Sequence, residues 1–305
     1  MKLKIWTALL LVYIIWGATY LGIRYAVETI PPFLMAGTRF LVAGTILTIW
    51  RRLAGDPAPT GGQALRAGLV GLLLLLGGNG LVSLAEKNVA SGIAALIVGS
   101  APLWMTALEA MRPGGIRPNW LGLLGLGIGF GGIVLLVGPS LLHVSLASSQ
   151  PLGIITLLFA ALFWSIGSIY SRSADLPKSV LLSTSIEMLV GGTGLYLAGT
   201  LTGEWRQLVL ADVTLRSWLG LILLTIFGSM VGFTAYAWLL RNAPVSLVAT
   251  YAYVNPLVAI LLGSLFAQET LTVHILVAAV VIIGSVVLIN KKREPAQTGS
   301  RKYNQ

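Results

Sequence analysis

Long apolar blocks, separated by short polar clusters, run along the whole chain of 305 residues. Dividing the sequence at these clusters and at Pro and Gly predicts ten helices of about 17–24 residues each. At about 1.5 Å per residue, such helices match a hydrocarbon core about 30 Å thick. The pattern therefore predicts an all-α membrane protein with ten transmembrane helices. The expected ranges are 5–25, 33–50, 67–85, 91–110, 119–138, 152–172, 179–200, 216–239, 246–267 and 274–290.

Composition supports a membrane protein over a soluble one. Hydrophobic residues make up 56% of the chain and charged residues only 10%, whereas soluble domains carry about 25% charged residues. The first block follows Lys2 and Lys4, continues to about Ile23 and lacks a convincing small-x-small cleavage site. We therefore expect it to be the first membrane helix and not a signal peptide.

Basic residues are distributed unevenly between the two sides of this helix arrangement. The net charge of +10 would suggest nucleic acid in a soluble protein, but here the charges lie between apolar blocks and form no continuous face. With the N-terminus inside, fifteen basic residues are cytoplasmic and four are not. This asymmetry predicts cytoplasmic N- and C-termini in a bacterial cytoplasmic (inner) membrane and no nucleic-acid partner.

The two halves of the chain resemble each other, which predicts a first five-helix repeat at 1–140, a second at 150–292 and a cytoplasmic tail at 293–305. A repeat with an odd number of helices inserts its second copy upside down. The expected fold is therefore two inverted five-helix repeats. At an offset of 148, Trp16 matches Trp164, Arg24 matches Arg172 and 39–44 matches 187–192; at an offset of 154, Asn88 matches Asn242 and Pro102 matches Pro256.

Aromatic residues form one stripe on the first predicted helix. Tyr13, Trp16 and Tyr20 follow spacings of three and four, so their side chains share a face. An interfacial belt or helix packing explains such a stripe, but Trp16 lies near the middle of the helix, where a belt residue is not expected. This favours a solute path lined by Trp16, Tyr20 and the repeat-equivalent Trp164.

Polar residues follow one line on the third predicted helix. Asn79, Ser83 and Glu86 lie at i, i+4 and i+7. An amide in a bilayer needs a partner, so Asn79 either bonds to another helix or contacts solute. Ser83 joins the candidate site, whereas Glu86, beside Lys87 at the boundary, is expected to be solvated.

Matched prolines predict a central site. Pro256 follows Tyr251 and Asn255, and a proline frees the carbonyl four residues earlier, near Ala252. Pro102 occupies the equivalent place in the first half. Paired helix breaks indicate a substrate cavity, so Pro102, Tyr251, Asn255 and Pro256 are candidate substrate-binding residues.

Two charges lie deep within predicted helices. Arg39 and Glu187 are repeat equivalents of opposite sign, each about 10–12 Å from its helix start. Side chains tilt toward the N-terminus of their own helix, which sends the two in opposite directions. We therefore expect separate polar partners and treat both as gating or coupling candidates.

No pattern of enzyme chemistry stands out. The chain has no Cys, His143 and His274 lack metal-ligand spacing, and no zinc-protease, nucleophile-elbow or Walker A motif occurs. We expect no catalytic residue, no metal and no cofactor, and hence no enzyme.

Several short motifs resemble one family. They are Trp16-Gly17-Ala18-Thr19-Tyr20, Pro31-Pro32-Phe33 leading to Arg39-Phe40, Ser246 to Asn255-Pro256, and Gln268-Glu269-Thr270-Leu271-Thr272. In this order and spacing they resemble the drug/metabolite transporter superfamily, in its ten-helix EamA branch of bacterial permeases, over nearly the whole chain. Where an acidic turn would precede the fifth helix, Arg112-Pro113-Gly114-Gly115 stands instead. Symmetry thus gives Glu269 no special role, and helix capping is the expectation.

The resemblance implies an inverted-repeat transporter with a central cavity. The predicted helices that line the cavity are 5–25, 67–85, 91–110, 152–172, 216–239 and 246–267, and those at 119–138 and 274–290 are peripheral. Members typically export metabolites or amino acids, and others carry sugars or nucleotide sugars. The leading hypothesis is a secondary transporter or facilitator exporting a small metabolite such as an amino acid. The alternative is a structural or regulatory membrane subunit without transport. Expected partners are the solute and the bilayer; a homo-oligomer is left open.

Overall fold

The computed structural model describes residues 2–111, 118, 120–142, 150–243, 245–248 and 250–291. The expected tail at 293–305, His143 and the turn at 112–115 lie outside these residues.

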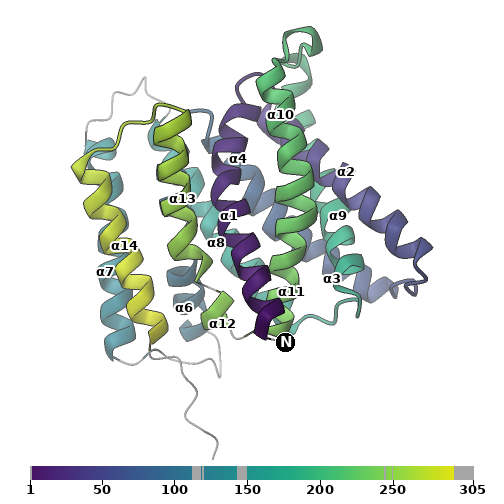
Figure 1. Cartoon of the computed structure of the whole chain (residues 1–305), viewed down its shortest axis with the longest axis horizontal. Coiled ribbons are helices and arrows are strands. Elements are labelled where there is room, and N and C mark those ends of the chain that lie inside the picture. The colour runs from purple at the N-terminus through teal and green to yellow at the C-terminus, as the bar shows by residue number, and fades with distance from the viewer. Residues whose placement is uncertain are drawn as a thin grey trace, which may run out of the picture.

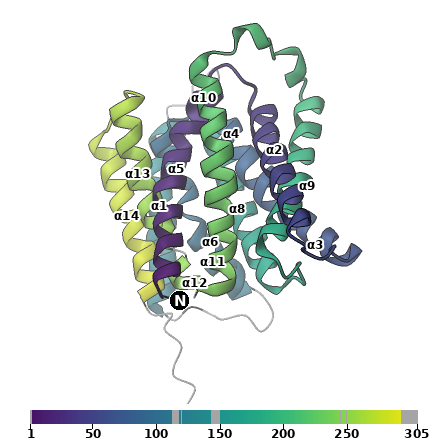
Figure 2. The same ribbon diagram turned by 45° about the vertical axis from the view of Figure 1, so that its right-hand side comes forward.

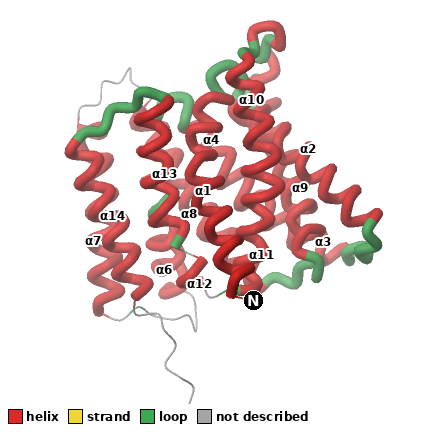
Figure 3. Tube along the Cα trace, viewed as in Figure 1, coloured by secondary structure: helices red, strands yellow, loops and turns green. Residues whose placement is uncertain are grey.

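Within the described residues the chain forms helices and loops without a strand (Figure 3). Consecutive helices that run in the same direction are grouped here as one pass across the bundle. The helices then make ten passes, as the apolar blocks predict, and together they form one bundle (Figure 1). Each predicted range lies on one pass. The passes are α1 (Lys2–Ala26), α2 (Pro32–Leu53), α3–η1–α4 (Gly61–Gly71, Leu72–Gly80, Leu81–Ala85), α5–α6 (Ser91–Val98, Ala101–Met111), α7 (Trp120–Leu142), α8 (Gln150–Ser173), α9 (Val180–Leu201), α10–η4–α11 (Leu215–Leu223, Leu224–Phe233, Thr234–Asn242), α12–α13 (Val245–Val248, Tyr251–Phe266) and α14 (Val273–Lys291).

Seven of the described helices are long and apolar enough to cross a membrane, and three shorter apolar helices accompany them. Large apolar side chains remain exposed along the bundle, as a lipid environment requires. Exposed tryptophans mark both ends: Trp50 and Trp120 lie at one end, Trp205 and Trp218 at the other. Tryptophans concentrate at membrane interfaces, so these pairs mark the two faces of the membrane.

The third pass of each half contains a π-helical stretch, which apolar periodicity does not predict. These stretches are η1 and η4, with α-helix before and after each. Both contain glycines, among them Gly78 and Gly228, that let neighbouring helices approach. A π-helical stretch is rare and occurs frequently at functional sites.

Of the two matched prolines, Pro102 lies beside a helix interruption, whereas Pro256 lies inside a continuous helix, so the paired helix breaks expected from the sequence are found only at Pro102. Gly99 and Ser100 separate α5 from α6, and Pro102 lies in the first turn of α6; Pro256 lies within α13. A Cβ added at Gly99 would stand 2.9 Å from the Pro256 ring and 3.2 Å from the Ala252 carbonyl. The fourth and ninth passes therefore pack directly against each other here, the backbone at Gly99 against the Pro256 ring and the Ala252 carbonyl.

Two helices stand apart from the others. α7 packs chiefly against α14, and Figure 1 shows this pair at one edge of the bundle. By contrast, α1 lies beside α10 in the middle of both views (Figure 2). The peripheral position expected for the helices at 119–138 and 274–290 matches this arrangement.

The two ends of the bundle differ in chemistry. We term the end that holds Arg51, Arg66, Arg172 and Arg241 the basic end; the chain begins there. The other end, which we term the capped end, is closed by two carboxylates from the second half. Glu204 accepts from the backbone N–H groups of Phe33 and Leu34 at the start of α2, and Glu269 accepts from Ser91 and Gly92 at the start of α5.

Removal of the Glu269 carboxylate, which caps α5, should cause a measurable loss of stability. Glu269 accepts from the Ser91 backbone N–H and hydroxyl at 2.7 and 2.8 Å and from the Gly92 N–H at 3.1 Å. Because these donors have no other acceptor after truncation, Glu269→Ala should lower the free energy of unfolding by about 1–3 kcal/mol. Thermal melting in detergent measures the change. Glu28→Ala, which removes only an exposed ion pair to Arg216, is the control at about 0–1 kcal/mol; equal losses would contradict the capping role.

Candidate functional site

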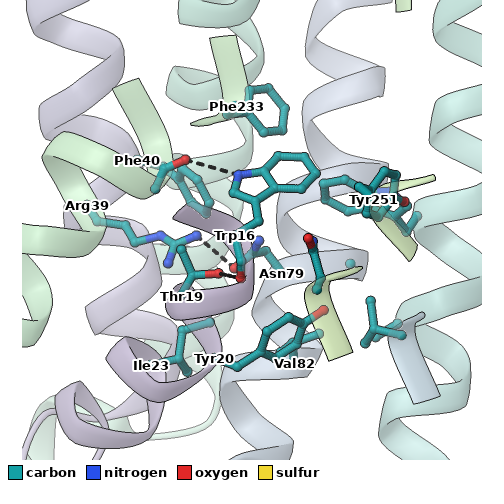
Figure 4. Close-up of a pocket in the computed structure, with 16 residues that line it drawn as sticks. Trp16, Thr19, Tyr20, Ile23, Arg39, Phe40, Asn79, Val82, Phe233 and Tyr251 are labelled. Carbon is teal, nitrogen blue, oxygen red and sulfur yellow. Dashed lines mark hydrogen bonds between the residues drawn. The ribbon is translucent and has the colours of Figure 1, made fainter. Parts of the chain in front are cut away.

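A small cavity lies inside the bundle, bounded by α1, α2, η1, α4, α5, α8, η4 and α13 (Figure 4). Its volume is about 50 Å³, room for one or two waters. Most of the predicted site residues meet here, although they come from both halves of the sequence. Those that line the cavity are Trp16, Tyr20, Arg39, Asn79, Trp164, Tyr251 and Asn255.

Five aromatic side chains cluster at this cavity, and all of them except Tyr236 line it. We term them the aromatic box: Trp16, Trp164, Phe233, Tyr236 and Tyr251. Trp16 lies at the centre, with ring centroids 4.7 Å from Tyr236, 5.4 Å from Trp164 and 5.7 Å from Tyr251. Several pairs meet edge to face, the arrangement that ring quadrupoles favour. The stripe expected on the first helix thus faces the interior at Trp16 and Tyr20.

The polar atoms of the box have partners inside the protein. The Trp16 Nε1–H donates to the Gly228 carbonyl of η4 at 3.3 Å, and the Trp164 Nε1–H donates to the Tyr251 hydroxyl at 3.2 Å. The Tyr236 hydroxyl lies 3.0 Å from the Ser168 hydroxyl. These bonds hold the rings in fixed orientations, so the box offers a solute mainly apolar ring surface.

Asn255 joins two helices at the edge of the cavity. With its amide oriented to suit its neighbours, the nitrogen donates to the carbonyls of Tyr13 and Tyr251, each at 3.2 Å. The side chain is 3% exposed. Asn255 therefore ties α13 to α1 while lining the cavity.

Arg39 reaches the same cavity from α2, and Figure 4 shows its guanidinium beside Asn79. Its Nη2 group donates to the Asn79 amide oxygen at 2.9 Å. The sequence left Asn79 between an interhelix bond and solute contact; the structure shows the bond, and Asn79 also lines the cavity. Arg39 extends the lining to α2, beyond the helices that the resemblance implies.

Ser83, Pro102 and Pro256 do not line this cavity. The Ser83 hydroxyl donates to the Asn79 carbonyl one turn earlier in the same pass, at 2.9 Å. Pro102 and Pro256 lie instead around Gly99, where the fourth pass packs against the ninth.

Glu187 lies in a second, larger cavity at the basic end. This cavity has a volume of about 380 Å³, and its lining includes Arg172, Glu187 and Arg241. The Glu187 carboxylate accepts from the Ser183 hydroxyl at 3.0 Å. Arg39 and Glu187 thus have separate polar partners, as the tilt of their side chains predicts.

Phe233, at the end of η4, lines both cavities. Tyr236, one turn further on, belongs to the aromatic box and lines the larger cavity. The box therefore separates an inner cavity from one at the basic end. Sequence reasoning missed both residues, although their spacing of three on an apolar pass was a signal for a shared face.

The position of Glu86 differs from the one expected from the sequence. The sequence placed it in solvent beside Lys87, but the side chain is 0% exposed and neither carboxylate oxygen has a partner among the described residues. Arg24 of α1, 62 residues away in the sequence, donates to the backbone carbonyl of Glu86 at 2.7 Å and holds this turn against the bundle. Burial and the nearby Glu269 raise the pKa of the Glu86 carboxyl well above its usual range.

Comparisons with known proteins identify the family. The sequence model of the EamA-like transporter family matches residues 3–138 and again residues 151–291. The chain is 40% identical to a protein of Escherichia coli strain K12 named as the inner membrane transporter YedA, over 94% of this chain and 90% of that protein. It is 24% identical to the Bacillus subtilis transporter YvbV, over 98% and 96%.

More distant likenesses cover the chain as fully. The chloroplastic WAT1-related protein At3g02690 of Arabidopsis thaliana is 24% identical over 93% of this chain and 69% of its own length. A solved crystal structure superposes with a TM-score of 0.63 at 19% identity, over 94% of this chain and 96% of that one, and so shares the fold. Because the family model spans both halves and a relative is 40% identical over nearly the full length, the chain belongs to the EamA-like transporter family.

Proposed function

We propose that the protein is a secondary transporter or facilitator that exports a small metabolite, such as an amino acid, across the cytoplasmic membrane. The aromatic box and the cavity beside it are the proposed substrate-binding site. Membership of a transporter family supports the class of function, and the printed name of the E. coli relative supports the inner membrane as its location.

One observation carries this proposal: two cavities separated by the aromatic box, with Phe233 on both sides. The larger cavity lies at the basic end, whereas backbone caps and hydrogen bonds such as that from Tyr25 to the Phe266 carbonyl hold the capped end together. A central site with access from one end at a time is the arrangement of alternating-access transporters. The described arrangement fits a state with access from the basic end.

The proposal includes two inverted repeats at 1–140 and 150–292. The family model matches the chain twice over nearly these ranges. Five passes in each half orient the halves oppositely. The π-helical stretches η1 and η4 occur on the third pass of each half, which supports structural equivalence.

A counterflow screen tests the function. Purified protein in proteoliposomes, preloaded with one unlabelled amino acid, sugar or nucleoside at a time, should accumulate the matching labelled solute for at least one compound. Protein-free liposomes and liposomes with heat-denatured protein are the controls. If every solute stays outside while the protein co-purifies with one membrane partner, the alternative of a regulatory subunit without transport replaces this proposal.

Orientation gives a separate prediction. The basic residues that mark the basic end should face the cytoplasm. Because the chain has no Cys, single cysteines report position without background. In intact cells, a membrane-impermeant maleimide should label Gln207→Cys, in the exposed loop before α10, and should label Ala58→Cys, before α3, only after permeabilisation. The reverse pattern would overturn the predicted orientation.

A further inference from the structure

Arg39 carries hydrogen-bonding capacity that the described protein does not use. The side chain is 3% exposed, and its Nη2 group bonds to Asn79, but Nε and Nη1 have no partner. These two nitrogens carry three N–H donors. Leaving a buried charged group so incompletely bonded is costly, and more so within a membrane.

No carboxylate neutralises this guanidinium. In the part of the chain that the structure describes, the ion pairs are Arg51–Asp56, Arg66–Asp175 and Arg216–Glu28, all of which include exposed or half-buried side chains. Glu86, a buried acid with an electrostatic influence on Arg39, makes no ion pair with it. The raised pKa of Glu86 favours the neutral carboxyl form. Arg39 therefore has no anionic partner among the described residues, and its charge is met only by the Phe40 ring, 4.3 Å from Cζ.

The guanidinium lines the cavity beside the aromatic box, where Figure 4 shows it close to Trp16, Thr19 and Asn79. The rest of the lining is mainly apolar or aromatic and includes Ile23, Val82 and Val98, with Thr19 and Asn255 as further polar residues. One positive charge matches one negative charge, so a monoanion suits this site better than a dianionic phosphate. Carboxylate is the monoanion whose two oxygens match guanidinium donors.

From this geometry we infer that the transported solute is a monocarboxylate with an apolar or aromatic body, whose carboxylate binds the free N–H groups of Arg39. The inference rests on the proposed function, because it assigns a substrate class to the same site. The cavity of about 50 Å³ accommodates little more than the carboxylate itself. The body of the solute then requires rings of the aromatic box to move aside, and Phe233 and Tyr236 are the two that border the larger cavity.

Matched pairs of probes test the inference by binding, independently of transport. The probes are phenylalanine with phenylalaninamide, and 3-phenylpropionate with 3-phenylpropionamide. The two members of each pair differ at the carboxylate and share the aromatic body. Thermal melting of the purified protein across a concentration series of each probe gives apparent affinities. Wild-type protein should bind each acid about tenfold to hundredfold more tightly than its amide, since charge-assisted hydrogen bonds are lost in the amide.

Two variants remove this preference by different routes. Arg39→Gln removes the charge. Asn79→Asp places an internal carboxylate where the Asn79 oxygen lies 2.9 Å from Arg39, so that the guanidinium is already paired. Both should lose the preference, so that each acid binds no more tightly than its amide. Asn79→Asp satisfies the buried charge, so it keeps the test valid if Arg39→Gln fails to fold. Arg66→Gln, which removes an exposed positive charge, should retain the preference.

The outcomes separate the inference from the proposed function. Acids that bind wild type no better than amides, or that keep their advantage in both variants, would overturn the carboxylate assignment. Counterflow of sugars or amines without any acid would also overturn it, while transport itself would stand. If the acids bind through Arg39 but no solute moves in proteoliposomes, the site assignment holds and the transport function is wrong.

Discussion

Gly71→Ala should destabilise the protein severely. A Cβ at Gly71 would lie 2.1 Å from the Glu187 carbonyl oxygen and 2.8 Å from the carbon of the same carbonyl. Both are backbone atoms of α9, so no side-chain rotation relieves the overlap. The α3 and α9 helices must separate, and overpacking of this kind costs about 3 kcal/mol or more. The expected result is a large drop in melting temperature or a loss of monodisperse protein on size-exclusion chromatography in detergent.

Gly127→Ala is the matched control. Gly127 lies in α7, and a Cβ there would meet no atom within 4 Å. Replacing a helical Gly by Ala without a clash stabilises a helix by about 0.5–1 kcal/mol. Opposite signs for the two substitutions are therefore expected. Similar stability of Gly71→Ala and wild type would show that α3 and α9 do not pack as closely as the structure has them.

Trp16→Ala should cause the largest loss of solute binding. Its ring is the hub of the aromatic box, with contacts to Trp164, Phe233, Tyr236 and Tyr251. The other rings of the box pack against it, so its loss should let them rearrange and weaken binding by about tenfold to hundredfold. Counterflow and melting shifts with the solute found in the screen measure this effect.

Two further variants separate binding from folding. Trp16→Phe keeps a ring in the box and loses only the Nε1 bond to the Gly228 carbonyl, so it should retain most of the affinity. Trp120→Ala removes a tryptophan that is 69% exposed on α7, and it should leave affinity unchanged. If Trp16→Ala folds and binds solute like wild type, the box serves packing and the solute path lies elsewhere.

The number of passes and seven of the sixteen residues that line the inner cavity could be predicted from the sequence. The apolar blocks match the thickness of a bilayer, and this constraint fixes the helices almost independently of tertiary contacts. Trp16 and Tyr20 could be placed on one helix face by spacing, and Trp164 by its match to Trp16. That these residues meet in one cavity is observed; that they bind solute remains a prediction.

Features that depend on contacts between distant segments could not be predicted. The π-helical stretches contain Gly78 and Gly228, which lie close to Trp164 and Thr19 of other passes, and apolar periodicity does not encode these contacts. The burial of Glu86 depends on a hydrogen bond from Arg24, 62 residues away. In both cases the sequence gives the type of each residue but not the distant residue that contacts it in the folded chain.

The caps at the capped end have a consequence for how the protein is made. Glu204 follows the helix start that it caps by about 171 residues, and Glu269 follows Ser91 by 178. A ribosome that adds about 5–20 residues per second needs roughly 10–35 s to synthesise that length. During this interval the nascent first half lies in the bilayer with the N-termini of α2 and α5 uncapped. A chain truncated near 142 should therefore be a substrate for membrane proteases, and co-expression of the missing half from a second gene should rescue it.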